Sequence, residues 1–133
     1  MKERITSIVV NAAVIVMICL ALFLAGTWWR LHDQFALGED ALRRGDFTGA
    51  VAGYESAIHM YIPFNPTVEK SARQLWGLAE ASERLGDINR ALIAYRALRS
   101  SFYADRWLVT PGKDWIDRCD KKIAALVPLQ KER

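Results

Sequence analysis

Two stretches decide the fold of this chain: GDFTGAVAGYESAI at residues 45–58 and GDINRALIAYRALR at residues 86–99. Each begins with a glycine and places a small residue five positions later, a tyrosine nine positions later and an apolar residue twelve positions later. Such a glycine is suited to end a preceding helix, and apolar residues three or four positions apart line one face of the next helix. The stretches therefore predict two helical hairpins built on one plan. The matching residues are Gly45, Ala50, Tyr54 and Ala57, and then Gly86, Ala91, Tyr95 and Leu98.

Helical periodicity continues on both sides of these stretches, and no segment after Arg30 alternates as a strand would. Asn65 before Pro66, and Thr110 before Pro111, each resemble an N-cap followed by proline at the first helical position. We therefore expect five helices, at 31–44, 47–60, 67–85, 88–102 and 111–126.

The repeated spacing resembles that of the tetratricopeptide repeat family, in which a turn glycine is followed by alanine, an aromatic residue and alanine. Upstream of the first glycine, Leu37-Gly38 stands where the family has a Leu-Gly pair. The second unit departs from the pattern, because Leu78-Ala79 replaces Leu-Gly and Leu98 replaces the last alanine. The two turn glycines are 41 residues apart (86 − 45), so about seven residues are added to the usual repeat length.

The N-terminal end carries a candidate membrane span. From Ile5 to Trp29 there are 25 residues without a charged side chain, which as a helix would be roughly 37 Å long and would cross a hydrocarbon core of about 30 Å. A cleaved signal sequence is the alternative, but Ala25-Gly26-Thr27 is a poor cleavage site and the apolar run is too long. We expect a retained anchor with Trp28, Trp29 and Arg30 at the membrane interface, where indole rings are favoured.

The basic residues beside the span bear on its orientation. Lys2 and Arg4 precede it, and Arg30, Arg43 and Arg44 follow it, so the two sides are nearly balanced. A short charged tail before the first apolar residue usually stays in the cytoplasm. We expect a bacterial inner-membrane protein with a cytoplasmic N-terminus and a periplasmic C-terminal domain.

No flexible linker separates the span from the first repeat. Between Arg30 and Arg44 there is no proline, and the only glycine is Gly38. We expect a single rod from about Ser7 to Arg44, which would fix the domain's orientation above the bilayer.

Together these features predict an all-α fold, with an N-terminal transmembrane helix followed by a right-handed, tetratricopeptide-like array of about two and a half helical hairpins. Because about three repeats are normally needed for stability, we expect the array to rest on a partner, a second copy or the membrane. The expected divisions are a tail and anchor at 1–30, a helical domain at 31–126 with repeats at 31–62 and 67–102 and a capping helix at 111–126, and a tail at 127–133.

The helix at 88–102 offers one candidate binding surface. Arg96, Arg99 and Tyr103 fall on one side of it, away from its apolar face. A solvated basic face is the plain interpretation. The resemblance implies a docking strip for an acidic peptide or a carboxylate terminus, which Arg90 and Arg106 would extend.

Two loops and one membrane residue supply the other candidates. Trp107-Leu108-Val109 follow one helix, and Tyr61, Ile62 and Phe64 follow another; such residues are either buried or form an exposed patch for a partner or a membrane. Asn11 lies inside the apolar run, where an amide can hydrogen-bond to a neighbouring membrane helix or, near the membrane edge, to water.

Catalytic and metal-binding patterns are missing from the sequence. His32 and His59 have no cysteine or carboxylate at metal-ligand spacing, and there is no phosphate loop or nucleophile beside a base. Glu80 and Glu83 are expected to form surface ion pairs with Arg84, and Cys119 to be a small buried hydrophobe. We expect no cofactor and no enzymatic activity.

The charge balance excludes a nucleic-acid footprint. Without Lys2, Glu3 and Arg4 the chain has 16 basic and 14 acidic residues, a net charge of about +2.

The expected function is that of a non-enzymatic, membrane-anchored scaffold, an accessory subunit of an inner-membrane complex for motor, transport, secretion or respiratory work. It would contact an integral membrane protein through the span and a protein partner through the domain. The alternatives are an adaptor whose basic face binds an acidic peptide of a soluble client, and a homo-oligomer that assembles end to end.

Overall fold

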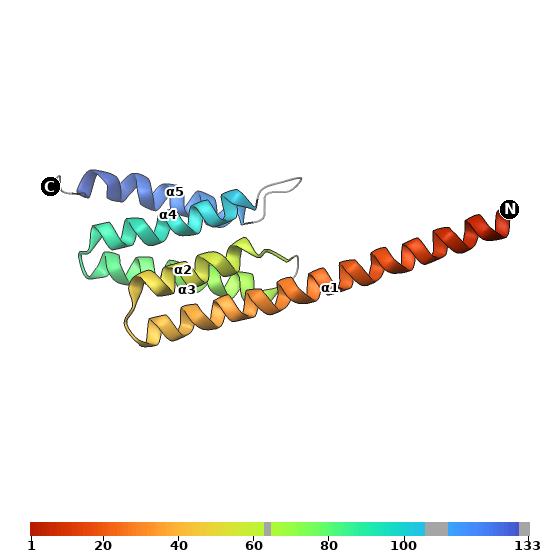
Figure 1. Cartoon of the computed structure of the whole chain (residues 1–133). Coiled ribbons are helices and arrows are strands. Elements are labelled where there is room, and N and C mark those ends of the chain that lie inside the picture. Colours follow the sequence, from red (N-terminus) through yellow and green to blue (C-terminus); the bar gives the residue numbers. More distant parts are fainter. Residues whose placement is uncertain (63–64, 106–111, 131–133) are drawn as a thin grey trace.

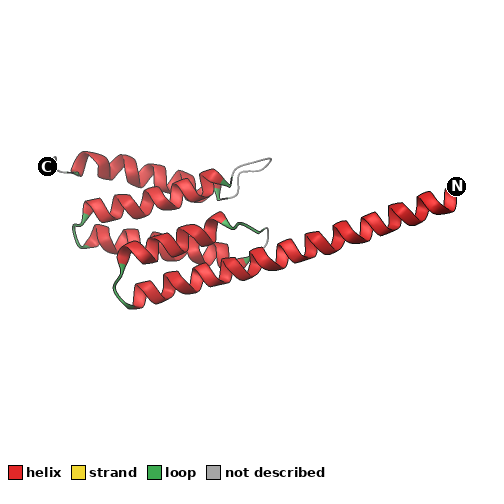
Figure 2. Ribbon diagram, in the orientation of Figure 1, coloured by secondary structure: helices red, strands yellow, loops and turns green. Residues whose placement is uncertain are grey.

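The structure is a computed structural model that describes residues 1–62, 65–105 and 112–130. These residues form five α-helices and one 3₁₀ turn, with no strand among them, so the all-helical prediction is confirmed (Figures 1 and 2). The helices are α1 (Lys2–Arg43), α2 (Phe47–His59), α3 (Pro66–Arg84), α4 (Ile88–Ala104) and α5 (Lys113–Leu126), and the 3₁₀ turn spans Val127–Leu129.

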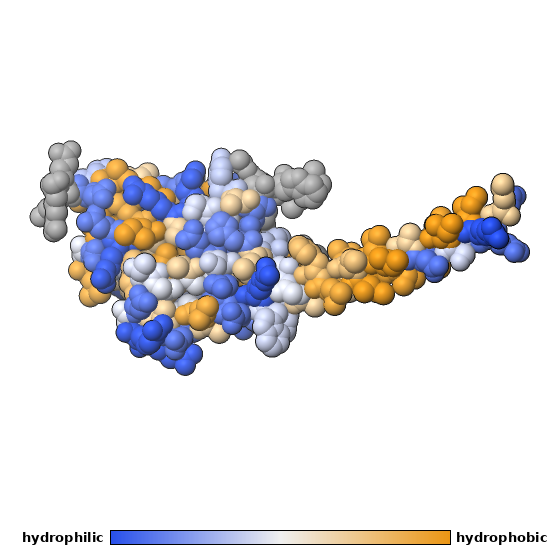
Figure 3. All heavy atoms as spheres, viewed as in Figure 1, coloured by the Kyte–Doolittle hydropathy of each residue, from blue (hydrophilic) through white to orange (hydrophobic). Residues whose placement is uncertain are grey.

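The longest element is α1, a single helix of 42 residues, which corresponds to about 63 Å at 1.5 Å per residue. Its N-terminal half extends away from the rest of the chain, and its C-terminal half is the first helix of the domain (Figure 1). The prediction of one continuous rod is confirmed, although the helix already begins at Lys2. It is long and apolar enough to cross a membrane, by length and composition. Figure 3 shows the apolar residues gathered along the extended half.

The remaining helices form antiparallel hairpins beside the end of α1. α2 packs on α1, α4 packs on α3, and α5 packs on α4. Contacts also join α1 to α3 and α2 to α4, which ties the hairpins to one another. The C-terminal end of α2 and the start of α3 lie at the end of the domain from which α1 emerges, and the α1–α2 and α3–α4 turns lie at the opposite end (Figure 1).

Gly45 and Gly86 each end a helix, as predicted, and the aspartate that follows each glycine caps the next helix. Gly45 and Gly86 have φ angles of 73° and 76°, a left-handed conformation that glycine adopts without strain. The carboxylates of Asp46 and Asp87 then accept hydrogen bonds from the backbone N–H groups of Gly49 and Arg90. These are N-caps, which typically contribute about 1 kcal/mol each.

The other predicted helix starts have different outcomes. Asn65 caps α3 by accepting a hydrogen bond from the N–H of Thr67, and Pro66 is the first helical residue, as expected. The prediction that the last helix begins at Pro111 is wrong. Gly112 takes a left-handed conformation with φ 68°, and α5 begins after it at Lys113.

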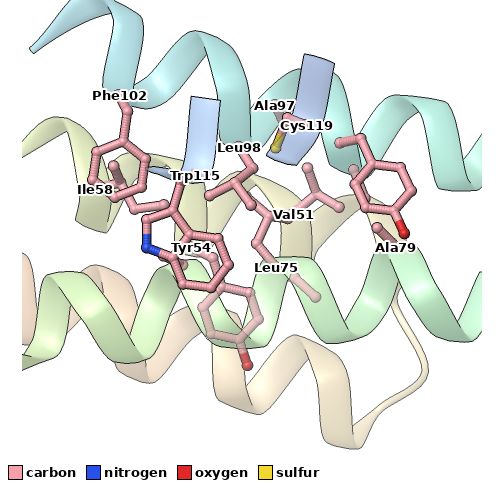
Figure 4. Packing of buried hydrophobic residues seen from close by; sticks show 14 of the residues in the cluster. Val51, Tyr54, Ile58, Leu75, Ala79, Ala97, Leu98, Phe102, Trp115 and Cys119 are labelled. Carbon is pink, nitrogen blue, oxygen red and sulfur yellow. The ribbon is translucent and has the colours of Figure 1, made fainter. Parts of the chain in front are cut away.

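The matching residues of the two stretches are all in the core. Ala50, Tyr54 and Ala57, and likewise Ala91, Tyr95 and Leu98, have no exposed surface. Figure 4 shows side chains of α2, α3, α4 and α5 meeting in this cluster. The predicted packing roles of these residues are therefore consistent with their burial.

Two glycines bring the backbones of α1 and α2 close together. A methyl group built on Gly53 would lie 2.5 Å from the Cα and N atoms of Gly38. A methyl group on Gly38 would lie 3.1 Å from the ring of Tyr54. The two backbones touch because neither residue has a side chain. The repeated spacing pointed to Ala50 as the small residue of this hairpin and did not single out Gly53.

Replacing Gly53 with alanine should separate α1 from α2. We expect Gly53→Ala to lower the free energy of unfolding by about 1–3 kcal/mol, the usual cost of overpacking. The measurement is urea unfolding of the full chain in detergent micelles. Gly77 in α3 is the matched control, because a methyl group there meets nothing within 4 Å. Gly77→Ala should raise stability by about 0.5–1 kcal/mol. Equal stability of Gly53→Ala and the unmodified chain would contradict the backbone contact.

Candidate functional site

Each of the two buried tyrosines donates a hydrogen bond to a glutamate on the preceding helix. The hydroxyl of Tyr54 in α2 donates to Oε1 of Glu39 in α1 at 2.9 Å. The hydroxyl of Tyr95 in α4 donates to Oε2 of Glu83 in α3 at 2.8 Å. Burial, and then the adjacent carboxylate, raise the pKa of both tyrosines above their ordinary value. Both hydroxyls are therefore neutral donors at physiological pH.

Each glutamate also holds a third helix. Glu39 accepts a second hydrogen bond from Nε2 of Gln74 in α3 at 2.8 Å. Glu83 pairs with Nζ of Lys122 in α5 at 3.2 Å. One carboxylate thus joins α1, α2 and α3, and the other joins α3, α4 and α5.

Sequence reasoning assigned different partners to Glu83. It expected a surface ion pair with Arg84, whereas the carboxylate contacts Tyr95 and Lys122 on two other helices. The repeat spacing would also have pointed to Glu80, which stands six residues before its turn glycine as Glu39 does. The second hairpin instead uses the glutamate almost one helical turn later.

The last helix is attached through aromatic side chains. The indole N–H of Trp115 in α5 donates to the carboxylate of Glu69 in α3 at 3.2 Å. The ring of Trp76 in α3 lies edge-on to Tyr95 at 5.0 Å and tilted against Trp115 at 5.9 Å. The guanidinium of Arg118 covers the Trp115 ring at 4.9 Å. One side of α5 is therefore part of the domain's interior.

The predicted basic strip on α4 is partly occupied by contacts within the domain. Arg99 forms an ion pair with Asp120 of α5 and lies over the ring of Tyr103 at 5.0 Å. Arg90 pairs with Asp87 at 3.5 Å and also covers a phenylalanine ring of α2. Arg96 is exposed. Two of the three described arginines thus contribute to packing, and Arg96 faces solvent.

Several candidate residues lie outside the described part of the chain or apart from the domain. Phe64, Arg106 and Trp107 are outside the described residues. Tyr61 is 37% exposed, and Ile62 packs partly against the core. The fully exposed part of α1 carries the intramembrane candidate, Asn11.

The predicted interface residues adjoin a contact that sequence reasoning missed. Trp28 and Trp29 are 50% and 71% exposed, and Arg30 is exposed. The ring of His32 lies 4.1 Å from that of Trp28. Its Nδ1 donates to the Trp28 carbonyl at 2.9 Å, so in the neutral ring Nε2 accepts from the hydroxyl of Thr67 in α3 at 3.1 Å. His32 therefore fastens α3 to α1 beside the tryptophans.

The two cysteines occupy contrasting environments. Cys119 is fully buried in the core, which confirms the prediction of a small buried hydrophobe, and burial raises the pKa of its thiol to about 12. Cys19 is exposed on the extended half of α1.

Asp105, which follows α4, has a buried carboxylate oxygen. Among the residues that the structure describes, nothing forms a hydrogen bond with its Oδ2 atom. Burial raises the pKa of its carboxyl to about 6, and His59 partly opposes this shift. A negative charge at the C-terminal end of a helix is also unfavourable.

Replacing Asp105 with asparagine should change how stability depends on pH. The folded state binds the proton of the Asp105 carboxyl more tightly than the unfolded state does. The contribution of Asp105 to the free energy of unfolding therefore increases as pH falls from about 6 towards 4. Asp105→Asn should remove that gain and stabilise the protein at pH 7 by about 1 kcal/mol. Urea unfolding of both chains across this pH range tests the expectation. A constant difference between them would contradict it.

Charge reversal at Arg99 and at Arg96 should have different effects on the free energy of unfolding. Arg99→Glu breaks the pair with Asp120 and places two carboxylates together, so we expect a loss of about 1 kcal/mol in unfolding free energy. Arg96→Glu, at an exposed position on the same helix, serves as the control and should leave stability within about 0.5 kcal/mol of the original. Equal effects of the two substitutions would refute the assigned role of Arg99.

Comparison with known proteins provides no family assignment. No protein-family model, curated protein or solved structure matches this chain.

Proposed function

We propose that this protein is a non-enzymatic, membrane-anchored scaffold, and an accessory subunit of a multi-subunit complex in a bacterial inner membrane. In this proposal α1 is a retained anchor with its N-terminus in the cytoplasm. The periplasmic domain is a short tetratricopeptide-like array that binds a second protein.

The observation that carries this proposal is the continuity of α1. Residues from Ile5 to Leu24 expose apolar side chains along its extended half, whereas Leu31 and Ala41 of the same helix are buried in the domain. A Gly/Ser linker would let a binding domain roam around its anchor. An unbroken helix instead fixes the distance and direction of the domain, which suits a subunit that positions one protein beside another.

The tetratricopeptide-like part of the proposal is supported by the equivalence of the two hairpins. Each has a left-handed turn glycine, an aspartate N-cap and a fully buried tyrosine at the same spacing. In both hairpins this tyrosine reaches a glutamate that also holds the following helix.

The exposed surface of the extended half of α1 favours the proposal that α1 contacts a partner within the membrane. Its side chains are exposed and no part of the described domain packs on them. Asn11 would supply a polar contact there, and an interhelical hydrogen bond of this kind contributes about 1 kcal/mol.

The adaptor alternative has less support. It depends on Arg96 and Arg99 acting together on an acidic peptide, and Arg99 already pairs with Asp120. A client would have to compete with that internal carboxylate.

The test is extraction of the tagged full-length protein from its native membrane in a mild detergent, followed by mass spectrometry. We expect one integral membrane protein in a fixed ratio to the tagged chain. Asn11→Leu should reduce the amount of that protein, whereas Arg96→Glu should leave it unchanged. Recovery of the monomer alone would reject the subunit proposal, and recovery of a soluble client that Arg96→Glu abolishes would favour the adaptor.

A further inference from the structure

We propose that the end of the domain from which α1 emerges rests on the bilayer, with Tyr61 and Ile62 of the α2–α3 turn in the membrane interface. The occupant of this surface is the lipid bilayer that α1 itself crosses. The inference rests on the proposed function in one respect, because it takes α1 to be a membrane span.

The start of α3 lies at nearly the same height along α1 as the two tryptophans. The hydroxyl of Thr67, the second residue of α3, lies 3.1 Å from Nε2 of His32 in α1. His32 follows Trp28 by four residues, which is about 6 Å along a helix axis. The start of α3 is therefore about one helical turn from the indole rings that are expected at headgroup depth.

The C-terminal end of α2 and the start of α3 lie at the end of the domain that faces the extended half of α1 (Figure 1). Tyr61 and Ile62 follow the last residues of α2. Ile62 and Met60 pack partly against the core, which holds these residues to the domain. Residues so placed cannot stand far above a membrane whose surface lies at Trp28 and Trp29.

Tyr61 has the chemical character of a residue at a membrane interface. Tyr61 is 37% exposed between two residues that pack on the core. Its ring is apolar and its hydroxyl is polar, a combination that favours the membrane interface over water or hydrocarbon. The two exposed tryptophans of α1 have the same character, so Tyr61 extends one aromatic set from the anchor to the domain.

The opposite end of the domain has a different composition. The turns there follow Arg43, Arg44 and Arg84, all of which are exposed. Leu85 is 85% exposed in the α3–α4 turn. Because Leu85 lies at the far end of the domain, it provides a control position for Tyr61.

Contact of the bilayer with both α1 and Tyr61 would stop the domain from rotating freely about the membrane span.

The experiment places one fluorescent probe at a time on the full-length protein in vesicles of phosphatidylcholine and phosphatidylglycerol. Cys19→Ala and Cys119→Ala remove the native thiols, and Tyr61→Cys, Trp29→Cys or Leu85→Cys supplies the labelling site. Lipids with a nitroxide near the headgroup quench probes at the interface. We expect the probe at 61 to lose most of its fluorescence, as the probe at 29 does, and the probe at 85 to be unaffected.

Two other results would overturn the inference in distinguishable ways. In the first, the protein floats with the vesicles and the probe at 29 is quenched, but the probe at 61 is no more quenched than the probe at 85. That result would support the membrane anchor and reject the contact between Tyr61 and the bilayer. If the protein does not float with the vesicles and the probe at 29 is not quenched, the proposed anchor fails and the docking fails with it. Helical content equal to that of the unmodified chain shows that each labelled variant is folded.

Discussion

The contact between Gly38 and Gly53 is the constraint on which the rest of the domain depends. It brings the backbones of α1 and α2 together without intervening side chains. That closeness sets where Tyr54 emerges from α2, and the tyrosine hydroxyl then reaches Glu39. The same carboxylate holds Gln74, so the position of α3 follows from the crossing of the first two helices.

The two glutamates show how an array of few helices is held together. A hydrophobic cluster favours burial but does not by itself select one arrangement of helices. Glu39 and Glu83 each accept from a neutral tyrosine and from a group on a third helix. Hydrogen bonds to a charged group contribute about 1.5–3 kcal/mol and require specific geometry, so they favour one packing over others.

Local features of the fold were predictable from the sequence. Glycine at a positive φ angle, an aspartate after it and buried residues at helical spacing are all properties of a few neighbouring positions, and Gly45, Gly86, Tyr54 and Tyr95 fulfil them. The continuity of α1 followed from the lack of helix breakers. The tetratricopeptide resemblance and the protein-binding function stay predictions.

Contacts between helices were not predictable in the same way. The pairing of Arg99 with Asp120 and of His32 with Thr67 depends on how separate helices cross. The sequence did not distinguish Gly53 from other small residues, because its role depends on the backbone of Gly38 in another helix. The start of α5 was misjudged because a proline before it gave a strong local signal, whereas the left-handed Gly112 determines where that helix begins.

The unbroken passage from the extended half of α1 into the domain also affects how the domain forms. A separate helix over residues 31–43 would be short enough to be marginal in water, because its first turn must be nucleated at a large entropic cost. As the continuation of an existing helix, these residues need only propagate it, one hydrogen bond per residue. A fragment cut at residue 31 would lose this continuation and would have to nucleate the helix anew.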